Sequence, residues 1–191
     1  MHFRTFELDG LVEVTPRQTL DHRGYFSEIF RSDVLQQHVG ELTFVQENQS
    51  LSIQIGTIRG IHFQTAPAVQ GKLVRCVAGS IFDVAVDLRH GSATFGRWAA
   101  VILSADVGNQ LWLPGGFGHG FCSLEPSTTI CYRVTDYYSA ANDKGVAWDD
   151  PDIGIEWPQV ADAQTLSTKD RVQPRLSQLP AYFSMENSPC A

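Results

Sequence analysis

The chain has 191 residues, 43% of them apolar, which is enough for one domain with a buried core. Its formal net charge of −7 argues against a nucleic-acid backbone as a partner. The sequence contains no run of about 18 apolar residues, and its N-terminus lacks the apolar stretch of a signal peptide. We therefore expect a cytoplasmic protein with no membrane span.

The predicted elements are mostly short strands. A strand-like run over 25–30 precedes the best helix candidate, residues 31–38. Further strand-like runs follow at 71–77, 80–88, 97–103, 110–113 and 128–134. Turn signals rich in Gly, Asn, Asp and Pro separate them, a rhythm typical of an antiparallel sandwich or barrel. No linker or repeat divides the chain. We expect a single all-β domain over 1–191, with a few short peripheral helices and a less regular tail over 170–191.

Strand alternation predicts which side chains share a face. In 81–88, Asp83 and Asp87 lie on the face opposite Phe82 and its apolar neighbours. In 128–134, Tyr132 shares a face with other apolar residues. There it either packs in the core or delivers a proton to a carbanion.

The segment Arg59-Gly60-Ile61-His62-Phe63-Gln64 is the most informative part of the chain. It places a guanidinium and an imidazole close together, and Lys72 enters the next strand-like run. An imidazole beside fixed positive charge suits proton abstraction from carbon with stabilisation of the anion. Strict alternation sends Arg59 and His62 to opposite faces, so we predict a bulge at Gly60 that brings both into one cavity.

Histidine and cysteine spacings argue against a metal site. His62 is not part of a His-x-His pair, and His119 has no histidine neighbour, so a metal-dependent cupin is disfavoured. Four glycines surround His119, which predicts a tight loop. None of the four cysteines forms a Cys-x-x-Cys pair, and we expect buried, reduced thiols. They are Cys76, Cys122, Cys131 and Cys190.

Two polar segments carry further candidates. Arg23 sits in a turn, where it either binds phosphate or is simply solvated. Lys169 and Asp170 are positioned to begin a helix capped by Ser167 or Thr168.

Ten motifs in register give the chain a family resemblance from about Asp21 to Asp170. They are Asp21-x-Arg23-Gly24-x-Phe26-x-Glu28, Phe44-Val45-Gln46-Glu47-Asn48, Arg59-Gly60-Ile61-His62-Phe63-Gln64, Gln70-Gly71-Lys72-Leu73-Val74-Arg75, Phe82-Asp83-Val84-Ala85-Val86-Asp87-Leu88-Arg89, Thr94-Phe95-Gly96, Gln110-Leu111-Trp112-Leu113-Pro114, Gly118-His119-Gly120-Phe121, Tyr137-Tyr138 and Trp148-Asp149-Asp150-Pro151. Together these motifs resemble the dTDP-4-dehydrorhamnose 3,5-epimerases. The resemblance implies a cupin-like β-jelly roll, a homodimer, a dTDP-4-keto-6-deoxyhexose substrate, and no metal or organic cofactor.

The resemblance also implies residue roles. His62 matches the base beside the 4-keto group, and Asp170 the carboxylate that orients it. Lys72 matches the cation that stabilises the enolate oxygen, and Tyr132 the acid that reprotonates the opposite face. The positions that match substrate-binding residues are Arg23, Phe26, Glu28, Gln46, Asn48, Arg59, His119, Tyr138, Asp143 and Lys169.

The chain departs from the family pattern in three places. Asp143 stands where a glutamate is usual, the stretch 115–118 lacks a usual carboxylate, and 49–57 is less polar than expected. These departures bear on substrate selection more than on the core chemistry.

Four alternatives remain open at this stage. The first two are an epimerase that inverts only C3 or only C5 of a related sugar, and a 3,4-ketoisomerase. The others are a non-catalytic nucleotide-sugar-binding module and a metal-dependent oxygenase. Binding alone does not require an acid and a base together, which favours an enzyme.

Overall fold

The computed structural model describes residues 1–184. Its strands are β1 His2–Thr5, β2 Val12–Thr15, β3 Gln18–Asp21, β4 Gly24–Ser27, β5 Gln46–Ser52, β6 Ile58–Gln64, β7 Lys72–Ala78, β8 Ser80–Asp87, β9 Arg89–His90, β10 Trp98–Ser104, β11 Gln110–Leu113, β12 Phe117–Ser123, β13 Thr128–Val134, β14 Asp143–Gly145 and β15 Phe183–Ser184. The α-helix is α1 Ser32–Val39, and the 3-10 turns are η1 Ala163–Thr165, η2 Asp170–Val172 and η3 Leu176–Gln178. The all-β prediction is confirmed.

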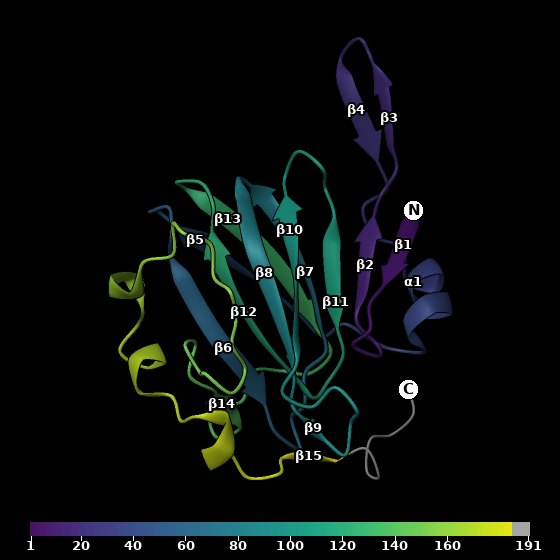
Figure 1. The fold of residues 1–191 in the computed structure, drawn as a ribbon. Helices are drawn as coiled ribbons and strands as arrows, with labels where there is room; N and C mark the ends of the chain where they lie inside the picture. The colour runs from purple at the N-terminus through teal and green to yellow at the C-terminus, as the bar shows by residue number, and fades with distance from the viewer. Residues whose placement is uncertain (185–191) are drawn as a thin grey trace.

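Two antiparallel sheets face each other (Figure 1). One has six strands in the order β1-β2-β11-β7-β13-β5, and the other has five in the order β10-β8-β12-β6-β14. Apolar side chains from both sheets fill the space between them, among them Val74, Leu111, Ile130, Leu103 and Phe121. The helix α1 packs on the outer face of the six-stranded sheet through Leu35 and its neighbours.

The predicted strand faces are confirmed in β8. Phe82, Val84 and Val86 pack on the outer side of the five-stranded sheet, where the segment after β14 covers them. Asp83 and Asp87 lie on the opposite, inward side, and both are 0% exposed. Two buried carboxylates on one strand need polar partners in the interior. Polar groups must therefore lie beside β8, between the two sheets.

The prediction of a loop around His119 is wrong. His119 lies in β12, which runs between β8 and β6 with every residue buried. The flanking glycines provide space instead of a turn. A Cβ atom on Gly118 would lie 2.6 Å from Cγ2 of Ile61, and one on Gly120 would lie 2.5 Å from its Cδ1. Close packing of β12 on β6 thus explains a glycine pattern that resembles a turn in sequence.

The predicted irregularity at Gly60 is confirmed. The β6–β12 register shifts between His119 and Phe121, and Arg59 and His62 both face one cavity. Gly60 has φ +121°, and an added Cβ would lie 2.5 Å from Cα of Gly120. Only glycine meets both conditions without strain.

We expect Gly60→Ala to destabilise the protein more than Gly24→Ala. Gly24 has a similar φ of +127° but open space around it, so the control reproduces the backbone strain without the collision. Overpacking adds about 1–3 kcal/mol to the loss of unfolding free energy. Urea unfolding at equal protein concentration measures the difference, and equal losses in the two variants would contradict this explanation.

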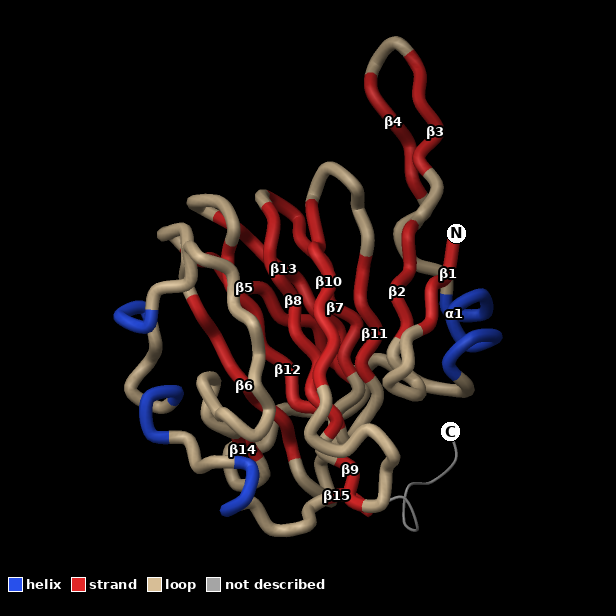
Figure 2. The backbone as a smooth tube through the Cα atoms, viewed as in Figure 1, coloured by secondary structure: helices blue, strands red, loops and turns tan. Residues whose placement is uncertain are grey.

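Two segments leave the sandwich (Figures 1 and 2). The β3–β4 hairpin projects from the body, and the chain from β14 to β15 runs along the five-stranded sheet as a strap of turns. Cys76, Cys122 and Cys131 are buried and free as predicted, whereas Cys190 lies outside the described residues. Within residues 1–184, no helix is long and apolar enough to cross a membrane.

Candidate active site

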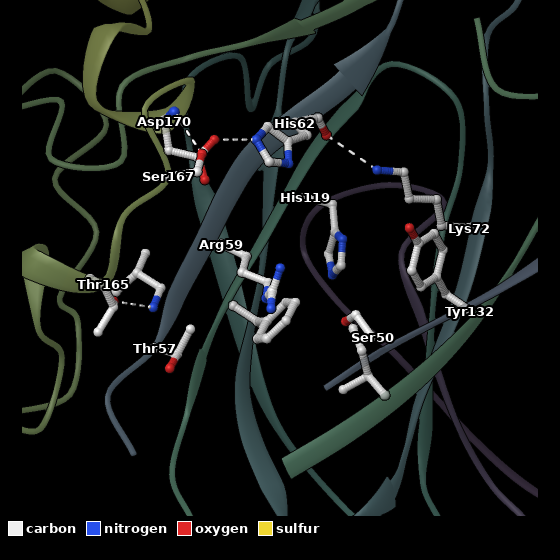
Figure 3. Close-up of a pocket in the computed structure, with 13 residues that line it drawn as sticks. Ser50, Thr57, Arg59, His62, Lys72, His119, Tyr132, Thr165, Ser167 and Asp170 are labelled. Carbon is white, nitrogen blue, oxygen red and sulfur yellow. Dashed lines mark hydrogen bonds and ion pairs between the residues drawn. The ribbon is translucent and has the colours of Figure 1, made fainter. Parts of the chain in front are cut away.

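A polar cavity opens between the two sheets (Figure 3). It has a volume of about 300 Å³, and a second lobe of similar volume adjoins it. His62, Lys72 and Tyr132 line both lobes. These three residues come from β6, β7 and β13, so both sheets contribute to the site.

His62 and Asp170 form a hydrogen-bonded pair. Nε2 of His62 lies 2.5 Å from Oδ1 of Asp170, across 108 residues of sequence. Burial of Asp170 acts to raise its pKa, but hydrogen bonds with His62, Ser167 and the Gly60 backbone prevail and hold that pKa below its ordinary value. An ionised Asp170 accepts the Nε2 proton, which leaves Nδ1 as the basic nitrogen of the ring.

The turn that carries Asp170 has a simple local cause. The backbone N–H of Asp170 donates to the Ser167 hydroxyl at 3.1 Å, at the start of η2. Leu166 buries its side chain against Ile58 and Cys122. The predicted helix capped by Ser167 or Thr168 is instead a 3-10 turn whose N-cap is Lys169, without a side-chain cap bond. The Ser167 hydroxyl and the packing of Leu166 hold Asp170 beside β6.

Lys72 places an amine inside the cavity. Its Nζ donates to the backbone carbonyl of His62 at 3.3 Å. Burial lowers the pKa of Lys72 to about 8, although Asp143 and Asp83 act to raise it and Lys169 acts to lower it further. A cation with little hydration interacts strongly with a negative charge that develops beside it.

Tyr132 approaches from the sheet opposite His62. It is on β13 of the six-stranded sheet, whereas His62 is on β6 of the five-stranded sheet. Burial raises the pKa of Tyr132, Arg59 acts against that rise, and Asp143 adds to it. The phenol thus keeps its proton at neutral pH and suits the role of a proton donor.

Arg59 and His119 complete the wall of the first lobe. Arg59 is anchored through Nη2 to the carbonyl of Leu51 at 2.9 Å and through Nε to the Ser52 hydroxyl at 3.3 Å. His119 pairs through Nε2 with Oδ1 of Asp83 at 2.7 Å. Figure 3 shows both side chains beside the same space as His62 and Lys72.

The second lobe gathers five of the predicted binding residues, namely Gln46, Asn48, Tyr138, Asp143 and Lys169. Gln46 donates to Asn48 at 2.7 Å and accepts the backbone N–H of Tyr138 at 3.1 Å. Asp143 accepts from Lys169 at 2.5 Å and from the Tyr138 hydroxyl at 3.1 Å. Asp143, which stands where the family usually has a glutamate, therefore links Lys169 to the exposed ring of Tyr138.

Three predicted binding residues do not line the cavity. Arg23, Phe26 and Glu28 belong to the β3–β4 hairpin or follow it, and neither lobe includes them. Arg23 pairs with Asp21 of the same turn at 2.6 Å, and Phe26 is 76% exposed. Within one chain, the hairpin projects away from the two sheets (Figure 1), and its residues do not line either lobe.

Several lining residues were missed in the sequence. Ser50, Thr57, Thr165 and Ser167 place hydroxyl groups in the first lobe. They are ordinary in strands and turns, so no local signal distinguishes them. Asp83 did carry a signal, because a carboxylate inside an apolar strand needs a buried partner.

Comparison with known proteins agrees with the geometry. A family model described as dTDP-4-dehydrorhamnose 3,5-epimerase matches residues 5–178. The dTDP-4-dehydrorhamnose 3,5-epimerase of Sinorhizobium fredii is 50% identical over 183 residues, covering 96% of this chain and 93% of that protein.

Two solved structures share the fold. The dTDP-6-deoxy-D-glucose-3,5-epimerase of Legionella pneumophila, in complex with dTDP-4-keto-L-rhamnose, has a TM-score of 0.87 at 39% identity, covering 94% of this chain and 95% of that one. A 3′-monoepimerase double mutant from Streptomyces bikiniensis, in complex with dTDP, has a TM-score of 0.89 at 33% identity, covering 97% and 94%.

The fold and these relatives define an isomerase, an epimerase of carbohydrates built on a cupin-like β-sandwich. The chain belongs to the dTDP-4-dehydrorhamnose 3,5-epimerase family.

Proposed function

We propose that this enzyme inverts C3 and C5 of dTDP-4-keto-6-deoxyglucose and forms dTDP-4-keto-L-rhamnose without a cofactor. The observation that carries the proposal is the placement of His62 and Tyr132 on facing sheets, on either side of one cavity that also contains Lys72. Inversion needs a base on one face of the sugar and an acid on the other, because a single group would return the original stereocentre.

His62 acts as the base. Asp170 accepts the proton on Nε2, so Nδ1 takes the proton from the carbon next to the 4-keto group. A positioned base contributes about 10²–10⁴-fold to the rate. The negative charge then moves to the C4 oxygen, which Lys72 stabilises. A preorganised donor of this kind lowers the barrier by about 3–4 kcal/mol. Tyr132 finally protonates the carbon from the opposite face.

Remote groups of the substrate supply binding energy without touching the reacting carbons. Arg59 is anchored by its backbone contact and suits the diphosphate, because a guanidinium binds phosphate through paired N–H groups. The second lobe, with its amides and Tyr138, suits the nucleoside. This arrangement leaves the sugar beside His62, Lys72 and Tyr132.

The proposal is tested by proton NMR in deuterium oxide with the enzyme and dTDP-4-keto-6-deoxyglucose, with no metal added. We expect loss of the C3 and C5 proton signals, and formation of a rhamnose product when a coupled reductase removes the ketone. No exchange at either carbon would overturn the proposal.

Inversion at a single carbon is the second candidate. The 3′-monoepimerase from Streptomyces bikiniensis has the same fold at a TM-score of 0.89. One base and one acid serve both reactions, since rotation of the sugar or its early release decides how many centres are inverted. Exchange confined to C3 or to C5 in the same experiment would establish this alternative.

We also propose that the protein is a homodimer in which the β3–β4 hairpin reaches the partner's cavity. The hairpin exposes Leu20, Tyr25 and Phe26, with 76% exposure for both Leu20 and Phe26. The edge strand β5 exposes Leu51, and Ile53 just beyond it is 72% exposed. Pairing across a two-fold axis would cover both apolar surfaces and the free edge. It would also give Arg23 a role in binding.

Mixing two inactive variants tests this arrangement. Arg23→Ala lacks the hairpin cation and His62→Ala lacks the base. If the partner subunit's Arg23 serves each cavity, a mixed dimer regains one intact site, and exchange reappears when the two variants are unfolded and refolded together. If Arg23 acts within its own chain, mixing restores nothing. Sedimentation of the wild-type protein as a 21.1 kDa monomer would refute the dimer itself.

A further inference from the structure

We propose that Asp83 is a positioning residue of the active site, which orients His119 toward the substrate and supplies a counter-charge for Lys72. Asp83 does not line the cavity; it lies behind the wall, on the inward face of β8. The inference rests on the proposed function, because that function gives Lys72 its role beside the enolate oxygen.

The first argument is the poor satisfaction of this carboxylate. Asp83 is 0% exposed, and its Oδ1 pairs with His119 at 2.7 Å. Its other oxygen, Oδ2, is buried without a hydrogen-bond partner among the described residues. A buried carboxylate in this state is unfavourable for folding. Stability alone therefore does not explain why a carboxylate occupies this position.

Asp87 is a buried carboxylate of the same strand whose hydrogen bonds explain it by stability alone. It lies four residues further along the same strand, on the same face, and is equally buried. Both of its oxygens are satisfied, by the guanidinium and backbone of Arg89 and by the hydroxyls of Ser92 and Thr94. None of these residues lines the cavity. The contrast indicates that Asp87 stabilises the fold, whereas Asp83 acts on the residues that line the cavity.

The second argument is orientation. Oδ1 of Asp83 accepts the proton on Nε2 of His119, so the ring is held with Nδ1 as its free nitrogen. The same relation holds between Asp170 and His62. The cavity thus contains two His–Asp pairs, one at the base and one at a binding residue. His119 is nearly buried at its wall.

The third argument is charge. Desolvation lowers the pKa of Lys72 to about 8, and the negative charges of Asp143 and Asp83 limit that decrease, whereas Lys169 adds to it. The other titratable or charged side chains that line the same cavity are Arg59, His62, His119, Tyr132 and Asp170. Without the charge of Asp83, Lys72 loses its proton at a lower pH and with it the positive charge that faces the enolate.

The test compares Asp83→Asn with Asp87→Asn. We expect Asp83→Asn to move the alkaline limb of the exchange rate to lower pH by about half a unit or more, because one nearby negative charge is gone. Asp87→Asn is the matched control. It should reduce thermal stability and leave that limb in place. An unchanged limb in folded Asp83→Asn would overturn the role toward Lys72.

A measurement on the wild-type protein remains decisive if Asp83→Asn does not fold. In ¹⁵N spectra of histidine-labelled protein, we expect Nε2 of His119 to stay protonated throughout the pH range of activity. An unprotonated Nε2 would overturn the assigned orientation. The two proposals fail separately, because a wild-type enzyme without exchange at C3 or C5 refutes the function, while the His119 spectrum still tests Asp83.

Discussion

Replacing His62 by alanine is expected to abolish hydrogen–deuterium exchange at both C3 and C5. The proposed base is then missing; Lys72 and Tyr132 lie on the opposite sheet, and the guanidinium of Arg59 does not accept a proton. Loss of a positioned base lowers the rate by about 10²–10⁴-fold. Proton NMR in deuterium oxide measures the loss, with the concentration of folded protein matched by circular dichroism.

The control for this variant is His38→Ala. His38 lies in the last turn of α1, stacked on Phe3 and remote from the cavity. The variant therefore removes an imidazole without changing the site. Binding of dTDP should survive in His62→Ala, because the hydrogen bonds that hold Gln46, Asn48 and Arg59 in place do not involve this ring. Wild-type exchange in His62→Ala would refute the assignment of the base.

Tyr132→Phe is expected to separate proton exchange from product formation. His62 still removes the proton, so deuterium enters from the same face and the original configuration returns. Formation of the inverted product falls by about 10²–10⁴-fold, since the acid on the opposite face is gone. Comparing the exchange rate with the rate of the coupled reductase in one sample measures both quantities.

Tyr137→Phe serves as the matched control. The Tyr137 side chain is 64% exposed and lines neither lobe, although it stands in the same segment as Tyr138. Its loss of a hydroxyl should leave both rates unchanged. If Tyr132→Phe forms product at the wild-type rate, the acid must be another group. The proposal that His62 and Tyr132 act on opposite faces of the sugar is then refuted.

Much of the sheet architecture was predictable because it depends on a local pattern. The alternation in β8 and β13 correctly separated the inward side chains, Asp83 and Tyr132 among them, from the outward ones. The bulge at Gly60 was predictable as well, since Arg59 and His62, three residues apart in one strand, need an irregularity to face the same cavity.

The features that the sequence does not reveal depend on contacts between residues far apart in the chain. Glycines around His119 look like a turn in sequence, and only the proximity of Ile61 shows that they permit close packing of two strands. The partnership of Asp83 with His119 joins residues 36 positions apart. The separation of Arg23 from the cavity depends on where the hairpin points, and strand periodicity carries no information about that direction.

The strap along the five-stranded sheet has a consequence for how the enzyme matures. Thr57 bridges to Asp162, and the backbone of Ile58 donates to the Thr165 hydroxyl at 3.0 Å, just before the turn that carries Asp170. All strands of both large sheets precede this strap in the chain. During synthesis the strands of both sheets therefore emerge before the carboxylate that pairs with His62. The His62–Asp170 pair is complete only once this mostly irregular segment lies against β6, so its formation depends on a part of the chain outside the two large sheets.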